Sequence, residues 1–224
     1  MRSALLLGCL AAGCGGGNSG FQAAVPTRAA IAINVPGARA SGSGAMSQAL
    51  LGAQATFYTQ TVQIATWLNG AASSMFQQID VAVASPPSGQ DATHEYWGPF
   101  TPALSPMTIE LAVEKVDAQD YNFFLGGKPK GADNSAFTGL MGGGVHQADA
   151  QHASGHLEAN FSESNTLDPT VNKATGVIAF VHDNTQDPRT VDVHFANFVD
   201  GSAGSMPLNA DYHYAEHSDT LGSC

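Results

Sequence analysis

The chain has little charge and few cations. Lys and Arg total 8 and Asp and Glu total 19 among 224 residues, so charged residues make up 12% of the chain and the formal net charge is −11. An average globular domain carries about 25% charged residues. Nucleic-acid phosphates are neutralised by clustered Lys and Arg, so this shortage of cations argues against a nucleic-acid partner. The shortage also disfavours electrostatic docking on an anionic membrane surface.

A long hydrophobic run is missing as well. The apolar stretch near the N-terminus extends only from Ala4 to Ala12, behind the early cation Arg2, and it is too short to span a bilayer. A cation, a short apolar run and then small residues are typical of a secretory signal peptide. The sequence therefore predicts export.

The end of this stretch, Ala11 to Cys14, resembles the lipobox of bacterial lipoprotein precursors. The resemblance implies that cleavage makes Cys14 the first residue and that Cys14 is acylated with fatty acids such as palmitate. The segment from Leu6 to Cys9 also fits the pattern, but cleavage there would leave an apolar run below the usual length. Gly15 follows Cys14, which in well-studied sorting systems implies passage to the outer membrane of the cell envelope.

Cysteine is scarce, with 3 in the chain. If Cys9 is removed with the signal peptide and Cys14 carries lipid, only Cys224 remains, and an intrachain disulfide is excluded. Cys224 is then a free or intermolecular thiol, or a sign that the reading frame ends early. The domain must rely on its hydrophobic core, and 43% hydrophobic residues are enough for one.

Composition divides the chain into three parts. Residues 1–13 are expected to be the signal peptide. Residues 14–44, rich in Gly, Ala and Ser, are expected to be the lipidated cysteine and a flexible tether, in which the apolar patch 29–33 is an optional strand. Residues 45–224 are expected to form a single globular domain.

A helical pattern opens this domain. Apolar residues recur at spacings of three or four between Met46 and Ile79, which predicts one long helix with a broad buried face. The stretch 46–79 contains no Lys or Arg, whereas helices lying on membranes normally carry cations on their polar face. Packing against a sheet is therefore the preferred interpretation.

The rest of the domain has the alternation of strands. Residues 107–116 alternate apolar and polar side chains and continue into 121–125, which predicts a hairpin. Further strands are expected near 136–141, 156–162, 176–182, 190–198 and 209–216. We therefore expect an α+β fold, in which the long N-terminal helix packs on a curved antiparallel β-meander or partial barrel of about seven strands.

The order of these elements, with Trp97, Gly98 and Pro99 leading into the first strong hairpin, is similar to that of a group of uncharacterised bacterial lipoproteins with a helix followed by a β-meander. The resemblance implies no particular activity.

Standard catalytic motifs are missing. There is no Gly-x-Ser-x-Gly sequence, and Pro129 follows Gly127 and Lys128 where a phosphate-binding loop needs Ser or Thr. Residues 183–187 begin like a calcium-binding loop, but Pro188 replaces the Gly that such a loop requires, so we interpret them as a hairpin turn.

Histidine is the one unusual ingredient, with 8 residues, all in the second half of the chain apart from His94. Two adjacent strands place Asp192, His194, Asp211 and His213 on one face, and imidazole with carboxylate is a ligand set for zinc or copper. The alternative is that these residues form the wet face of the sheet. A second, weaker candidate for metal binding comprises His146, His152 and His156.

Three hypotheses follow. The first is a non-catalytic, lipid-anchored envelope protein that binds a partner or has a structural role, without a cofactor; whether the partner is a protein or a small molecule stays open. The second is a metal-dependent hydrolase or metal-binding protein that uses the His and Asp residues above. The third is a carrier of hydrophobic ligands between helix and sheet, lined by residues such as Tyr212 and Tyr214.

Overall fold

The computed structural model describes residues 21, 28–34, 56–149, 151–217 and 222–223. The expected signal peptide and Cys14 lie outside these residues, as does Cys224.

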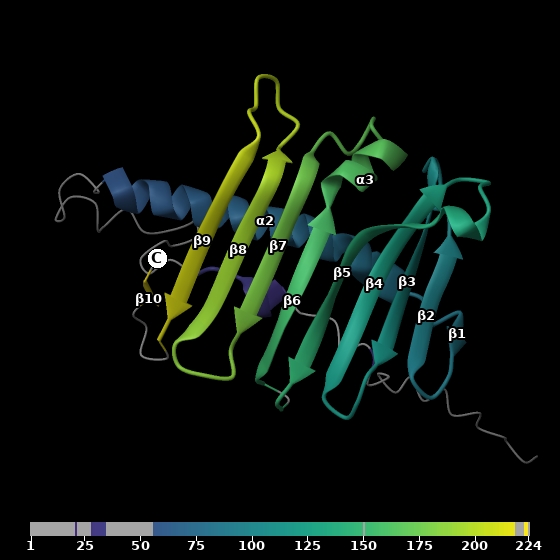
Figure 1. Cartoon of the computed structure of the whole chain (residues 1–224), viewed down its shortest axis with the longest axis horizontal. Coiled ribbons are helices and arrows are strands. Elements are labelled where there is room, and N and C mark those ends of the chain that lie inside the picture. The colour runs from purple at the N-terminus through teal and green to yellow at the C-terminus, as the bar shows by residue number, and fades with distance from the viewer. Residues whose placement is uncertain (1–20, 22–27, 35–55, 150, 218–221, 224) are drawn as a thin grey trace, which may run out of the picture.

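One antiparallel sheet dominates the structure. In the described residues its ten strands follow one another in sequence order, so each strand pairs with its neighbours in the chain, and β1 and β10 have one partner each (Figure 1). The strands are β1 (Gly89–Gln90), β2 (His94–Phe100), β3 (Met107–Lys115), β4 (Asp120–Pro129), β5 (Thr138–Gln147), β6 (Ala153–Asn160), β7 (Thr175–Asp183), β8 (Arg189–Val199), β9 (Leu208–Glu216) and β10 (Gly222–Ser223). The expected antiparallel meander is thus confirmed.

Helices make up a smaller part of the described structure. The helix α2 (Thr56–Val83) runs across one face of the sheet, behind the strands in Figure 1. The short helix α3 (Phe161–Leu167) lies at one end of the sheet after β6, and a 3-10 turn, η2 (Asn134–Ala136), precedes β5. The four-residue helix α1 (Arg28–Ile31) lies near α2 and β7.

The core lies between α2 and the sheet. On α2 the buried side chains recur every three or four residues, as at Leu68, Met75 and Ile79. On the strands every second side chain is buried, as expected for a sheet with one covered face. The core side chains from the sheet include Leu111, Val113, Phe123, Leu125, Leu157, Ile178, Phe180, Val191, Val193, Phe195 and Tyr214.

The expected α+β class and the partial barrel are wrong. The structure is nearly all-β, with a ten-stranded sheet where about seven strands were expected. The sheet is open, because β1 and β10 lie at its opposite ends. The expected helix was to begin at Met46, but α2 begins at Thr56 and residues 35–55 are outside the described part. Strands such as β2 escaped the sequence pattern because Gly98 and Pro99 interrupt its alternation.

Part of the segment expected to be a tether is packed into this core. Ile31 and Ile33 are buried, and the side chain of Asn69 on α2 bonds the backbone of Ile33 twice, accepting from its N–H at 2.8 Å and donating to its C=O at 2.9 Å. The hydroxyl of Tyr214 donates to the C=O of Asn34. Residues 28–34 therefore belong to the folded body.

The other face of the sheet, which we call the open face, is not covered by α2. It carries the alternate residues of the strands, including Phe124 at 47% and Val181 at 51% exposure. Histidines and carboxylates occupy many of the remaining positions, and β5 contributes Gly142 and Gly144. This face is where the residues predicted as metal ligands lie.

Candidate binding site

The four residues proposed as metal ligands are brought together as two hydrogen-bonded imidazole–carboxylate pairs. The register of β8 and β9 places Asp192 opposite His213 and His194 opposite Asp211. Nδ1 of His213 lies 2.6 Å from Oδ1 of Asp192, and Nδ1 of His194 contacts Oδ1 of Asp211. All four side chains are more than half exposed. Each imidazole thus faces its own carboxylate across the strands.

The second set of predicted metal ligands, His146, His152 and His156, does not converge on one point. Nδ1 of His146 on β5 lies 2.8 Å from Oδ1 of Asp120, while Nδ1 of His152 in the next turn lies 2.7 Å from Oδ2 of Asp149. Within the described residues no group of three His, Cys, Asp or Glu side chains is arranged to hold a metal ion. The structure therefore gives the metal-site hypothesis no support from these clusters.

A hollow lies instead at the end of the sheet where the β5–β6 and β7–β8 turns meet the end of β9. We call it the turn groove. Its volume is about 620 Å³, within the range of about 300–1,000 Å³ typical of small-molecule sites. It is lined by Gln151, His152, Asn184, Thr185, Gln186, Asp187, Arg189, Glu216 and His217. Every one of these side chains is polar.

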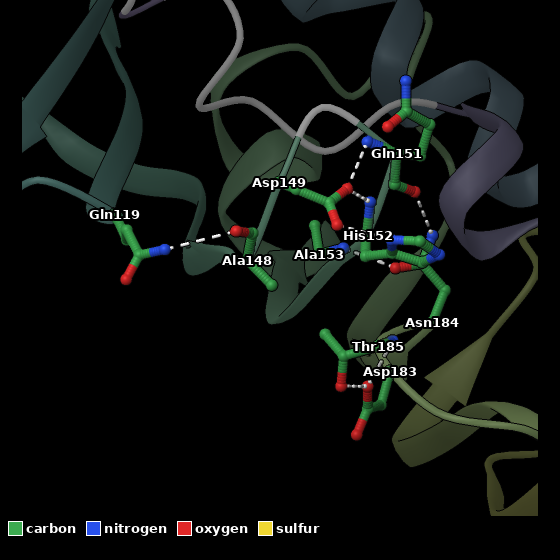
Figure 2. Close-up of polar contacts among 9 residues, drawn as sticks. All are labelled: Gln119, Ala148, Asp149, Gln151, His152, Ala153, Asp183, Asn184 and Thr185. Atoms are coloured by element: carbon green, nitrogen blue, oxygen red, sulfur yellow. Dashed lines mark hydrogen bonds and ion pairs between the residues drawn. The ribbon is translucent and has the colours of Figure 1, made fainter.

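Side chains tie the neighbouring turns together, as Figure 2 shows. Asn184 bridges two of them: its Oδ1 accepts from the backbone N–H of Ala153 at 2.5 Å, and its Nδ2 donates to the C=O of Gln151 at 3.2 Å. On the other side, Nε2 of Gln119 donates to the C=O of Ala148 at 3.2 Å. The wall of the groove is therefore held in place by bonds between turns as well as within them.

Each turn also has an internal carboxylate cap. Asp149 accepts from the backbone N–H of Gln151 and His152 and from the His152 ring, and the hydrogen bond from that ring is the main reason that the pKa of Asp149 is below its usual value. Asp183 accepts from the hydroxyl and N–H of Thr185, which lowers the pKa of Asp183. Both carboxylates thus stay ionised and keep the turns closed at neutral pH.

A charged pair is part of the lining of the groove. Nε of Arg189 lies 2.5 Å from Oε2 of Glu216, with side-chain exposures of only 20% and 26%. Nη2 of the same arginine donates to the C=O of Ala32 at 2.6 Å, so the guanidinium also anchors the N-terminal segment. Because the two charges neutralise each other and are half-buried, they present fixed polar groups to the groove.

Two imidazoles, those of His152 and His217, also line the groove. Nδ1 of His152 faces Asp149, and Nδ1 of His217 lies 3.3 Å from Oδ1 of Asp187. A carboxylate at Nδ1 favours the tautomer with its proton there, which makes Nε2 the hydrogen-bond acceptor. Each ring is therefore oriented through one nitrogen and offers the other.

Sequence reasoning identified part of this site only as local structure. Residues 183–187 were interpreted as a hairpin turn, and the structure confirms this, since β7 ends at Asp183 and β8 begins at Arg189. Arg189 and Glu216 were not singled out. Their opposite charges at facing ends of two consecutive predicted strands were the available signal, because hairpin partners lie opposite one another.

The space between α2 and the sheet bears on the carrier hypothesis. Its apolar pocket, lined by residues including Ile64, Leu68 and Tyr214, has a volume of about 90 Å³. Ligand sites usually exceed about 300 Å³. In the described part of the chain this interface is thus a packed core, and Tyr212 and Tyr214 belong to it as expected.

Comparison of the chain with models of protein families, with curated proteins and with solved structures finds no match. Among the described residues, no helix has both the length and the apolar character needed to cross a membrane. The function is therefore inferred from the chain's own residues.

Proposed function

We propose that this chain is a non-catalytic binding protein of the bacterial envelope, anchored by lipid on Cys14, whose turn groove binds a neutral, hydroxyl-rich small molecule such as a sugar unit. The observation that carries the proposal is the groove itself: a hollow of about 620 Å³ lined only by polar side chains and held by bonds between turns. Sites fixed before binding avoid the entropic cost of ordering loops around a ligand.

The lining favours hydroxyl groups over ions. Donors and acceptors are mixed, since amides, a hydroxyl and imidazoles each supply one or both. Among the charged side chains, Arg189 is opposed by Glu216, and Asp187 faces the imidazole of His217, so an anionic ligand would meet carboxylates and a cationic one would compete with existing pairs. A neutral ligand with several hydroxyls matches both properties.

The same pairing supports binding in preference to catalysis. A catalytic acid, base or nucleophile needs surroundings that tune its pKa or activate it. The strongest charges of the groove already neutralise each other at 2.5 Å. The residues that line the groove are thus better suited to hydrogen bonding than to proton transfer.

The groove is tested by calorimetric titration of the full chain with glucose, N-acetylglucosamine and maltose, with citrate and spermidine as charged probes. We expect a neutral sugar to bind. Gln186, which is exposed at the rim, is changed to Trp to fill the groove and should weaken binding by about tenfold or more. The matched control is Gln90→Trp, which places the same side chain at the opposite edge of the sheet.

Two results would overturn the groove proposal. One is the absence of binding by any of the three sugars, and the other is sugar binding that Gln186→Trp leaves unchanged. Binding of a charged probe alone would refute the proposed ligand class.

The anchor is supported by the lipobox-like segment from Ala11 to Cys14, and Gly15 favours the outer membrane as its destination. Two or more acyl chains hold a protein stably on a bilayer, so charge is not needed for attachment. Changing Cys14 to Ser should move the protein from the membrane fraction to the soluble fraction of lysed cells. Continued sedimentation of Cys14→Ser with membranes would refute this part of the proposal.

A further inference from the structure

The two edges of the sheet are protected to different degrees. Exposed backbone groups at an edge strand invite pairing with another chain, and proteins commonly block them with short strands, proline or bulges. At one edge β1 covers Glu95 and Tyr96 of β2, and beyond them β2 continues through a bulge that contains Pro99. That edge thus has a short strand, a proline and a bulge.

The opposite edge has less of this protection, because the two-residue strand β10 covers only the end of β9 and β9 contains neither proline nor glycine. The strand β9 is the outermost long strand on its side of the sheet (Figure 1). The strand β10 pairs only with Ala215 and Glu216, so residues 208–214 have no strand partner on that side within the described part of the chain. This stretch contains no proline, glycine or lysine and is regular in its alternation.

We propose that the free edge of β9 pairs with β9 of a second copy of this chain, forming a symmetric dimer with one continuous antiparallel sheet. Two-fold symmetry is the commonest arrangement of homodimers, and an antiparallel pair of identical strands satisfies it. Main-chain hydrogen bonds would supply much of the affinity, as in other complexes formed by strand addition.

The side chains of Asp211 and His213 on β9 select the register of the proposed pairing between the two copies. In a two-fold antiparallel pair, identical residues are equally far from the axis on the two strands. With the axis at Tyr212, Asp211 lies opposite His213 of the second copy, and His213 lies opposite its Asp211. An axis at Asp211 would instead oppose two carboxylates, and an axis at His213 would oppose two imidazoles.

The selected register repeats the pattern already present inside the sheet. On the open face, Asp192 faces His213 and His194 faces Asp211. Pairing at Tyr212 adds a third and fourth such contact, so acids and imidazoles alternate without interruption from β8 of one copy to β8 of the other. Residues 210–214 of the two copies would pair, and β10 would remain in place because it begins to pair at Ala215.

Cysteine cross-linking tests the register. The full chain is prepared with Cys9, Cys14 and Cys224 changed to Ser, and Tyr212→Cys is added. Since directly opposed strand residues lie within reach of a disulfide, mild oxidation should convert this chain to a covalent dimer. A mixture of Asp211→Cys and His213→Cys chains should cross-link with each other more readily than either does alone.

Charge changes test the interface without introduced cysteines. In sedimentation experiments His213→Asp should weaken dimerisation by about tenfold, because two favourable cross-strand pairs become two repulsive ones. The control is His146→Asp, which replaces another open-face histidine paired with an aspartate but lies on β5, inside the sheet. A chain carrying Asp211→Lys and His213→Lys should restore pairing when mixed with the His213→Asp chain.

The proposal is overturned if the cysteine-free chain sediments as a monomer at about 100 μM, since strand-addition complexes with Kd in the micromolar range would be populated there. It is also overturned if His146→Asp and His213→Asp have equal effects on association. Efficient cross-linking of Asp211→Cys alone or His213→Cys alone, with none at residue 212, would refute the register.

Discussion

The buried histidine on β7 gives the sharpest stability prediction. His182 is only 2% exposed, and in the described part of the chain neither Nδ1 nor Nε2 has a hydrogen-bond partner. A buried polar atom left without a partner costs about 1–3 kcal/mol, whereas an apolar side chain of similar size avoids this penalty. Changing His182 to Leu should therefore raise the free energy of unfolding by about 1–2 kcal/mol at pH 7.5.

The gain should grow as the pH falls. Burial lowers the pKa of His182 below its usual value of 6.5; the charge of nearby Asp183 opposes this shift, while that of His156 adds to it. Well above pH 6.5 the ring is neutral in both the folded and the unfolded state. Below pH 6.5 the unfolded chain binds a proton at this ring that the folded chain does not bind. The wild-type protein thus loses stability as the pH falls from 6.5 through the lowered pKa, by up to about 1.4 kcal/mol per pH unit.

Urea unfolding of wild type and His182→Leu between pH 7.5 and pH 5 measures this difference directly. Other titrating groups change both proteins alike, so the pH dependence of the difference isolates His182. The control is His146→Leu, an exposed ring paired with Asp120, for which we expect a change of about 1 kcal/mol or less at pH 7.5. A destabilised His182→Leu variant whose deficit is constant with pH would show that the buried ring is favourably bonded and refute the reasoning.

The remaining predictions concern packing of the backbone. Asn69→Ala removes both bonds to the backbone of Ile33 and should lower the free energy of unfolding by about 1–3 kcal/mol in urea titrations; an unchanged midpoint would mean that residues 28–34 do not dock on α2. Gly143→Ala places a methyl group 2.1 Å from the carbonyl oxygen of His156 and should cost more than about 2 kcal/mol. Gly70→Ala, on α2 with no atom within 4 Å of the added carbon apart from the adjoining residues and backbone of the helix itself, should instead stabilise by up to about 1 kcal/mol, and similar effects of the two glycine changes would contradict the packing described.

Local periodicity in the sequence was sufficient to predict much of the sheet. Residues 107–116 and 121–125 alternate so clearly that the β3–β4 hairpin was predictable, and the buried face of β8 followed from the same rule. The rule failed where alternation is interrupted or brief, as in β2 with Gly98 and Pro99 and in the two-residue strands. The fold class was misjudged for this reason.

The candidate site was less predictable. The sequence placed Asp192 and His194 on one face, but only the register shows that each pairs with a residue on β9. The turn groove depends on residues more than 25 positions apart, such as Arg189 with Glu216 and Gln151 with Asn184. Which turns meet depends on the register of the strands between them. Short-range sequence patterns carry no information about contacts between residues so far apart in the chain.

The amino-acid sequence by itself determined the low charge, the lipobox-like N-terminus and the antiparallel order of the central strands, because each is a property of composition or of neighbouring residues. The tertiary structure alone decided that residues 28–34 enter the core, that the open-face histidines pair with aspartates, and that residues 208–214 of β9 have no second strand partner among the described residues. These features arise from contacts between distant segments, whose geometry is settled only when the sheet is assembled.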